Sequence, residues 1–322
     1  MAEPWHTCID RELESVEDLM MRDLEYHGNS ELTEMCQYVV SSGGKRLRPA
    51  LCILSYYLNG GADATTPVRV GAAFEIIHSA SLIHDDINDQ GEVRRGRKTL
   101  HKEYTVSKAI IAGDYMFAMG FRLLSGSAPT IVDYIVEASA SMGAGEFVQK
   151  DYEHASNVTQ DDYIRIITGK TARLFEASAK SGAAVAGADM SAIDAIGDFA
   201  CNIGLAFQII DDTLDVTGDI HNTGKAVGTD LLEGKPTLPV IYAMEDPVYG
   251  PKVRDLFEKV DVTTEDVNAA LELIKKTDAV DRCIALAKEY ALGACSTLDQ
   301  FPDSVYRDSL ISLADYIVSR DR

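Results

Sequence analysis

Residues 84–89 of this 322-residue chain have the sequence His-Asp-Asp-Ile-Asn-Asp, and residues 208–215 have the sequence Gln-Ile-Ile-Asp-Asp-Thr-Leu-Asp. Each stretch ends a long apolar segment and contains aspartates at positions i, i+1 and i+4. If both segments are helical, residues i and i+4 lie on one face about 6 Å apart, so the first and last aspartates can bind one metal ion. Carboxylate oxygens suit Mg²⁺, which also takes phosphate oxygens from a substrate. A single stretch would equally fit a solvated helix end, but two indicate a diphosphate site.

Hydrophobic periodicity along the chain predicts helices. Apolar residues recur at helical spacing through most of the sequence, and no long segment alternates with period two. The segment from Val68 to Ile87 is apolar almost all round, which predicts a central, buried helix. No internal repeat or linker divides the chain. We therefore predict an all-α fold, in which about a dozen helices form one domain over residues 1–322.

Composition limits the partners and the compartment. The chain is 46% hydrophobic and 25% charged, as in ordinary soluble proteins, and its formal net charge of −21 argues against nucleic acid or an anionic membrane as a partner. The six cysteines have no C-x-x-C spacing, which indicates reduced thiols. No apolar run resembles a secretory signal or reaches the length of a membrane span. We expect a cytoplasmic protein with no membrane span.

Basic side chains accompany both acidic stretches. Residues 43–49 have the sequence Gly-Gly-Lys-Arg-Leu-Arg-Pro, and residues 94–98 have the sequence Arg-Arg-Gly-Arg-Lys directly after the first stretch. Glycine N–H groups, a lysine point charge and an arginine fork are suited to bind phosphate. Lys170 lies in an otherwise apolar run and requires an anionic partner there. The loop 218–236 follows the second stretch, and we expect it to cover a bound phosphate group.

His78 has two interpretations. On a helical wheel it shares a stripe with Phe74, Ser81 and Asp85. A lone histidine on a buried helix is usually a hydrogen-bonded core residue, but below a metal motif it could instead contact a ligand. Glu75-Ile-Ile-His78 also matches half of a di-iron site. The other Glu-x-x-His sequence, residues 3–6, lies outside the apolar helical segments, which argues against di-iron.

In this order, the motifs resemble those of the trans-type isoprenyl diphosphate synthases, the polyprenyl synthetase family. The resemblance extends from Gly43 to about Ala243 and includes the stretch 224–239, Gly-Lys-Ala-Val-Gly-Thr-Asp-Leu-Leu-Glu-Gly-Lys-Pro-Thr-Leu-Pro. It implies the isoprenoid synthase type of helical bundle around a central deep cavity. It also implies head-to-tail prenyl transfer, in which an allylic diphosphate ionises and C4 of isopentenyl diphosphate attacks the carbocation. A proton is then lost and diphosphate leaves.

The resemblance implies a role for each motif residue. Three Mg²⁺ ions would be held, with substrate bound, by Asp85, Asp89, Asp211 and Asp215. The implied catalytic set adds Asp86, Asp212, Lys170 and Lys225. The group that binds the allylic diphosphate would be Arg94, Lys170, Thr171, Gln208, Lys225 and Lys235. The group that binds isopentenyl diphosphate would be Gly44, Lys45, Arg48, His78 and Arg95.

Product length depends in this family on the residues before the first motif. Bulky aromatics four and five residues before it stop growth at short products, and here these positions are Ser81 and Ala80. The first bulky residue on the same stripe is Phe74, about 16 Å below Asp85. With Ile77 it could form the cavity floor, although Phe117, Phe121 and Met142 are other candidates. We expect geranylgeranyl diphosphate, with about twenty carbons, or a longer product.

Alternatives to this function stay open. A farnesyl diphosphate synthase would give a shorter product from the same motifs. A terpene cyclase usually keeps one aspartate motif and needs no isopentenyl site, and a non-catalytic subunit of a heteromeric synthase tends to lose one motif. This chain keeps both motifs and the basic residues. The family implies a homodimer, which the apolar segments 103–123 and 130–150 allow.

Overall fold

The structure is a computed structural model that describes residues 4–218 and 227–320. Its regular elements are almost all helical, which confirms the predicted all-α class, and within the described ranges its strands are a single two-stranded hairpin. In chain order the elements are η1 (Thr7–Ile9), α1 (Asp10–Asp23), α2 (Ser30–Val40), α3 (Leu47–Leu58), α4 (Thr65–Asn88), β1 (Val93–Arg94), β2 (Arg97–Lys98), α5 (Leu100–Glu103), α6 (Val106–Leu123), α7 (Pro129–Asp151), α8 (Gln160–Ile167), η2 (Thr168–Ala172), α9 (Arg173–Val185), α10 (Met190–Thr217), α12 (Thr229–Leu232), α13 (Leu238–Met244), α14 (Gly250–Phe257), α15 (Thr264–Ile274), α16 (Ala279–Thr297), η3 (Leu298–Gln300) and α17 (Val305–Ser319).

The described residues form two compact units. Unit 1 contains the described residues up to Ser139, together with 174–200 and 297–313, and it carries the first acidic stretch. Unit 2 contains the described residues of 140–173, 201–296 and 314–320, and it carries the second. The domain prediction, one domain over the whole chain, stays a prediction.

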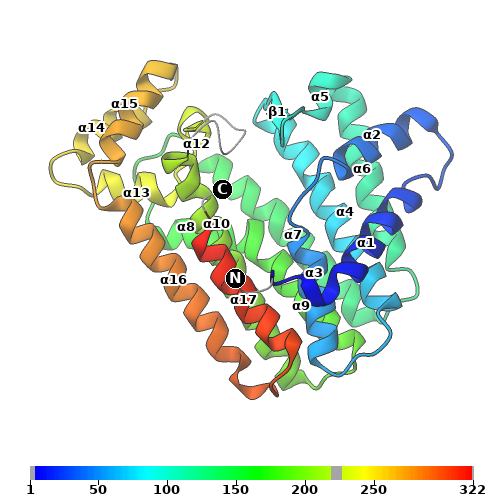
Figure 1. The fold of residues 1–322 in the computed structure, drawn as a ribbon. Helices are drawn as coiled ribbons and strands as arrows, with labels where there is room; N and C mark the ends of the chain where they lie inside the picture. The colour runs from blue at the N-terminus through cyan, green and yellow to red at the C-terminus, as the bar shows by residue number, and fades with distance from the viewer. Residues whose placement is uncertain (1–3, 219–226, 321–322) are drawn as a thin grey trace. The chain divides into compact units, whose positions relative to one another are not determined.

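Helix α4 is the core of unit 1. It packs against α1, α3 and α6, which surround it in Figure 1. Its side chains are buried on nearly every side, and Phe74, Ile76 and Ile77 have no exposed surface, as expected for a helix that is apolar all round. Small residues allow this packing, because a side chain at Gly120 of α6 would overlap Ile77. The aspartates at the end of α4 therefore project from a rigid support.

In unit 2, the second acidic stretch lies in the last turns of α10, which belong to this unit. Helices α13, α14 and α15 pack against one another in the same unit (Figure 1). Among the described helices, α10 alone is long and apolar enough, by length and composition, to cross a membrane. Because 67% of its most apolar 18-residue window is buried within the protein, it has the character of a core helix. The expectation that the chain has no membrane span stays a prediction.

Candidate active site

The first acidic stretch forms the last turn of α4. Asp85 and Asp89 are half-buried, and the Asp89 N–H donates to the Asp85 carbonyl at 2.8 Å, so the two residues are one helical turn apart. Asp86, between them, is 8% exposed and accepts a 2.7 Å hydrogen bond from Arg94 Nε. The first and last aspartates are thus separated from the middle one, whose carboxylate is occupied by an arginine of the following loop.

The basic loop after this stretch is a tight hairpin of β1 and β2. Arg94 pairs with Arg97 in an antiparallel register. The two turn residues, Arg95 and Gly96, have φ angles of 51° and 74°, as in a two-residue turn with both central residues left-handed. The sequence gives no strand signal here, because four cations occur without apolar alternation. The hairpin directs Arg94 back to Asp86.

Residues predicted to bind isopentenyl diphosphate gather in unit 1. The Arg95 side chain donates to the Gly43 carbonyl, and a side chain at Gly44 would lie 3.0 Å from Arg95 Nη1. Gly44 also has a φ of 151°, which favours glycine. Arg48 is 8% exposed and lies 4.8 Å from the centre of the Phe175 ring, and its Nε has no hydrogen-bond partner. Lys45 is exposed. This group of residues therefore offers many hydrogen-bond donors and few hydrogen-bond acceptors.

This cation group changes the protonation of its members. Burial lowers the pKa of Arg48 to about 10, against the attraction of Glu75. Burial, followed by the positive charges of Arg48 and Arg95, holds the pKa of His78 well below its usual range. The imidazole is therefore neutral at pH 7. It can donate one hydrogen bond without carrying a charge.

Glu75 and Arg46 were missed as parts of this arrangement. Arg46 is 7% exposed, donates to Glu75 Oε1 at 3.0 Å and to Glu17 Oε1 at 3.1 Å, and its backbone is left-handed with a φ of 48°. Its contacts are internal to the fold, so one of the three cations of residues 45–48 supports structure. The available signal was Glu75, a charged residue on an otherwise apolar helix that must have a buried partner.

The predicted product-length residues are buried. Phe74, Ile77 and Ala80 have no exposed surface, and Ser81 is 9% exposed with its hydroxyl donating to the His78 carbonyl at 2.8 Å. These four residues lie on α4 below the first acidic stretch, as predicted from the helical wheel. Their effect on product length is a question of function and is taken up below.

In unit 2, the second acidic stretch shows the same division among its aspartates. Asp212, in the middle, is 7% exposed and accepts hydrogen bonds of 2.7 Å from Tyr163 Oη and from Gln208 Nε2. Burial, and then the negative charge of Asp230, raises the pKa of Asp212 well above its usual range. The Asp211 side chain is 52% exposed and lies 3.2 Å from Arg320.

Asp215 is held by the backbone that follows it. Its Oδ1 accepts from the Thr229 N–H at 3.2 Å, and its Oδ2 accepts from the Asp230 N–H at 3.1 Å. These are orphan donors of the first turn of α12, whose N-cap is Gly228 and provides no side chain. Asp215 therefore caps the helix that follows the loop.

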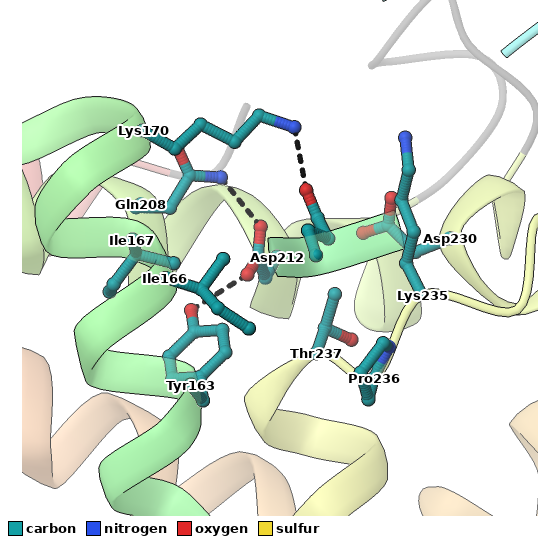
Figure 2. A pocket seen from close by; sticks show the side chains of 11 residues that line it. Tyr163, Ile166, Ile167, Lys170, Gln208, Asp212, Asp230, Lys235, Pro236 and Thr237 are labelled. Atoms are coloured by element: carbon teal, nitrogen blue, oxygen red, sulfur yellow. Dashed lines mark hydrogen bonds between the residues drawn. The ribbon is translucent and has the colours of Figure 1, made fainter. Parts of the chain in front are cut away.

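Several predicted site residues of unit 2 line one small cavity. It has a volume of about 60 Å³ and is lined by Gln149, Tyr163, Ile166, Ile167, Lys170, Gln208, Asp212, Asp230, Lys235, Pro236 and Thr237. Figure 2 shows Asp212 at its centre, with Tyr163 and Gln208 directed at the carboxylate and Lys235 on the opposite wall beside Asp230. Lys235 is 7% exposed and pairs with Glu233 at 2.7 Å. Thr171, next to Lys170, donates to Gln208 Oε1 at 2.7 Å.

Lys170 lies in a π-helical turn, η2, a rare conformation that is frequent at functional sites. Its ammonium group lies 2.5 Å from Glu146 Oε2 and donates to Gln149 Oε1 at 2.7 Å. The predicted anionic partner is therefore Glu146 of α7. Glycine brings η2 and α7 together, because a side chain at Gly145 would lie 2.8 Å from the backbone nitrogen of Lys170. Gly145 thus supports close packing of α7 against η2.

Two predicted features are not settled by this geometry. Lys225 and the rest of residues 219–226 of the expected covering loop lie outside the described residues. In the part of the chain that the structure describes, no group of three or more His, Cys, Asp or Glu side chains could hold a metal ion. Each acidic stretch alone offers two aspartates that are not buried.

Sequence reasoning also missed Tyr163 and Arg320. Tyr163 lies on α8, and an aromatic residue on an amphipathic helix ordinarily belongs to the core. Arg320 follows α17, and the last site residue predicted from the sequence is Lys235. Nothing in its local sequence distinguishes it from a surface arginine, so no signal was available.

Comparisons with known proteins give the class. The family model described as polyprenyl synthetase matches residues 29–274. The all-trans-nonaprenyl-diphosphate synthase (geranyl-diphosphate specific) of Rhodobacter capsulatus is 36% identical over 288 residues, which cover 88% of this chain and 87% of that protein. The geranylgeranyl diphosphate synthase of Methanosarcina mazei is 34% identical over 297 residues, which cover 90% of each.

A solved structure shows the same fold. The polyprenyl synthase from Caulobacter crescentus, complexed with calcium and isoprenyl diphosphate, aligns with a TM-score of 0.92 and 33% identity over 99% of this chain and 97% of that one. The fold is therefore the all-α isoprenoid synthase type, as predicted. With the family match across residues 29–274, the chain belongs to the polyprenyl synthetase family.

The low pKa of His78 predicts a pH dependence of stability. Below about pH 6.5 the unfolded chain gains a proton that folded His78 does not, so this residue makes stability fall as the pH falls. We expect His78→Gln to reduce the loss between pH 7 and pH 5 by at most about 1.4 kcal/mol per pH unit. Urea unfolding of the unchanged protein and of His78→Gln at pH 7, 6 and 5 measures the free energy of unfolding. If this free energy falls equally with pH in the two proteins, His78 does not contribute to the loss.

Proposed function

We propose that the chain condenses isopentenyl diphosphate head-to-tail with an allylic diphosphate and forms an all-trans polyprenyl diphosphate. One observation carries this proposal. A single chain of the family keeps both aspartate motifs at helix ends, together with the unit 1 cation group of Arg48, His78 and Arg95. A prenyltransferase must bind two diphosphates, and these residues supply the two kinds of site that the reaction needs.

The donor set fits divalent metal ions. Asp85 and Asp89, one turn apart on α4, and Asp211 and Asp215 on α10 are the carboxylate pairs that we assign as ligands. Hard oxygen donors of this type, completed by water and phosphate, suit Mg²⁺. When bound, Mg²⁺ would neutralise the charge that develops on the departing diphosphate. The calcium in the complex of the Caulobacter crescentus protein supports a divalent ion, and the number of three ions is our proposal.

The chain's own cations would stabilise the leaving group. Lys170, Lys235 and Arg94 carry fixed positive charges, and Gln208 offers an amide on the same wall as Asp212. Lys225 and Thr171 complete the set that we propose for the allylic diphosphate. Because charge appears on this group as the C–O bond breaks, donors that are positioned in advance lower the barrier. Glu146 holds Lys170 in place until an anion competes for it.

The unit 1 cation group would bind the acceptor. Arg48 and Arg95 supply charge, Gly44 allows close approach to its backbone, and Lys45 extends the group into solvent. Neutral His78 donates a hydrogen bond without adding to the repulsion among the arginines. No general base on a side chain is assigned, because diphosphate itself can accept the proton.

Alternative functions differ in products. A terpene cyclase would form a hydrocarbon from the allylic diphosphate alone, and a non-catalytic subunit would show no turnover without a second chain. The retention of both aspartate motifs supports neither. A farnesyl diphosphate synthase would stop at a shorter product, which the small Ala80 and Ser81 do not favour.

We further propose geranylgeranyl diphosphate or a longer product. Phe74 and Ile77, buried on α4 below the metal motif, would set the limit. The relatives of Rhodobacter capsulatus and Methanosarcina mazei are named for a nonaprenyl and a geranylgeranyl product, so both lengths occur among similar proteins. A cytoplasmic location is consistent with the acidic composition and stays a prediction.

The aspartate assignment predicts loss of turnover. Asp85→Asn and Asp211→Asn each remove one anionic ligand, and we expect each to lower kcat at saturating Mg²⁺ by at least about 10²-fold. The assay combines isopentenyl diphosphate with each allylic starter and sizes the dephosphorylated products. If both aspartates act on one diphosphate, the double variant is affected by much less than the product of the two effects.

The control is Asp255→Asn, which changes an exposed aspartate on α14 and is expected to behave like the unchanged protein. Normal turnover in either motif variant would remove that aspartate from the metal site. Products formed without isopentenyl diphosphate would favour the cyclase, and turnover that needs an added second protein would favour the subunit.

The floor assignment predicts a change of product length. Phe74→Ala removes the bulky side chain, and we expect products longer by at least one isoprene unit, detected by reversed-phase chromatography. Because the loss of a buried phenylalanine costs about 3–5 kcal/mol of stability, Phe74→Leu is tested beside it. Phe257→Leu, at a site 2% exposed in unit 2, is the matched control. Unchanged length in both Phe74 variants would exclude Phe74 as the floor.

A homodimer is the proposed assembly. Helix α6 exposes large apolar side chains at Val106, Ile110, Ile111 and Phe121, and such a surface is typical of an interface.

We therefore expect the 35.1 kDa chain to sediment as a dimer and Ile111→Asp to shift it to a monomer. Ile111 is 56% exposed, so the change leaves the fold of one chain intact. Leu292→Asp, at an apolar site on α16 that is 74% exposed, is expected to remain dimeric. Sedimentation velocity separates the two states. A dimeric Ile111→Asp would exclude this surface.

A further inference from the structure

Arg320 of unit 2 lies against the second aspartate motif although it is 105 residues beyond Asp215 in the sequence. Its side chain is only 2% exposed. Nη2 lies 3.2 Å from Asp211 Oδ1 and donates a 2.6 Å hydrogen bond to the Phe207 carbonyl, and the guanidinium lies 4.1 Å from the centre of the Phe207 ring. Arg320 therefore contacts α10 at two residues, Phe207 and Asp211, which are one helical turn apart.

The contact with Asp211 uses one nitrogen and one oxygen. Nε and Nη1 of Arg320 are buried and have no hydrogen-bond partner, so the guanidinium does not form the two-pronged pair that arginine and carboxylate commonly adopt. The second oxygen of Asp211 is not needed by this pair. Because the Asp211 side chain is 52% exposed, it would otherwise rotate among several rotamers.

From this geometry we propose that Arg320 is a positioning residue that holds Asp211 by Oδ1 and presents Oδ2 to a divalent metal ion. The inference rests on the proposed function only in taking Asp211 as a metal ligand. The Phe207 carbonyl and ring fix the guanidinium from the other side, so that the aspartate is oriented by a rigid partner. Groups that orient a metal ligand commonly change metal affinity by 10- to 100-fold when they are removed.

A purely structural role would give a different result. An ion pair that only anchors the segment after α17 would affect thermal stability and leave metal affinity unchanged. The charge of Arg320 alone would also repel a metal ion, so its removal would tighten binding. Only orientation of Asp211 makes removal of the arginine weaken binding.

The test measures Mn²⁺ binding to the full chain by electron paramagnetic resonance, with no substrate, and the Mg²⁺ dependence of turnover. We expect Arg320→Met to raise the dissociation constant for Mn²⁺ and the half-saturating Mg²⁺ concentration by about 10-fold or more. Turnover at saturating Mg²⁺ should change less. Arg320→Lys should recover part of the affinity, because lysine keeps the charge but loses the planar fork and the ring contact.

The matched control is Arg282→Met in the same unit. Arg282 lies 3.7 Å from the centre of the Tyr242 ring and pairs with Glu245 at 2.8 Å, so it repeats the arrangement without touching the motif. Its loss should leave Mn²⁺ binding unchanged. If Arg320→Met fails to fold, as judged by thermal unfolding, Arg320→Lys decides: unchanged or tighter Mn²⁺ binding overturns the proposal, as it does for Arg320→Met.

Asp211→Asn separates the two levels of the argument. If it weakens Mn²⁺ binding while the Arg320 variants do not, Asp211 is a ligand and the positioning role of Arg320 is wrong. If Mn²⁺ binding is unchanged in Asp211→Asn, the metal assignment of the proposed function fails first. Weakened binding in Asp211→Asn and Arg320→Met, partly restored in Arg320→Lys, supports the proposal.

Discussion

The middle aspartate of each acidic motif is a buried, hydrogen-bonded anchor, and the geometry of the two outer aspartates depends on it. Asp86 is bound by Arg94 in unit 1, and Asp212 is bound by Tyr163 and Gln208 in unit 2. A buried carboxylate without such partners would cost several kcal/mol, so the partners are required wherever the middle position faces inward. Successive residues on a helix point about 100° apart. Anchoring the middle residue therefore fixes the direction in which its neighbours project.

The two anchors use different chemistry, and this difference follows from their surroundings. Arg94 comes from a hairpin that is itself short and exposed, so the anchor of the first motif also ties that hairpin to α4. The anchor of the second motif is neutral, a phenol and an amide whose hydrogen bonds lower the pKa of Asp212, but burial and the negative charge of Asp230 raise that pKa by more. The wall that Asp212 shares with Lys170 and Lys235 thus sets two lysines beside a carboxyl whose charged form is disfavoured by burial. That suits a wall proposed to meet a diphosphate.

Local groups of basic residues allow an acidic chain to bind the anionic diphosphates proposed as its substrates. A chain with a net charge of −21 repels anions at long range, but within a Debye length of about 8 Å the nearest groups dominate. Four arginines act on His78, and Glu75 offsets them without contacting solvent. Because burial lowers the effective dielectric constant, these charges interact more strongly than the same number of charges would on the surface. The unit 1 group is therefore basic inside an acidic protein.

Much of this arrangement could be predicted from the sequence, and the exceptions have physical causes. The period of apolar residues indicated α4 and its burial, and the i, i+4 spacing placed Asp85 and Asp89 one turn apart. Tyr163 and Arg320 could not be predicted, because their partners are distant in the chain and each has an ordinary local sequence. The hairpin after α4 was missed since its turn depends on a left-handed Arg95, a conformation that arginine rarely adopts.

Asp215 shows why the second motif must end in an aspartate. Both of its oxygens accept backbone N–H groups of α12, so the carboxylate ties the end of the motif to the start of that helix. Asparagine at this position would offer one oxygen, and its amide nitrogen would face an N–H group. The same carboxylate therefore places Asp230 at the cavity and serves the proposed metal site. The position of α12, and with it the wall that carries Lys235, is tied to the residue on which metal binding is proposed to depend.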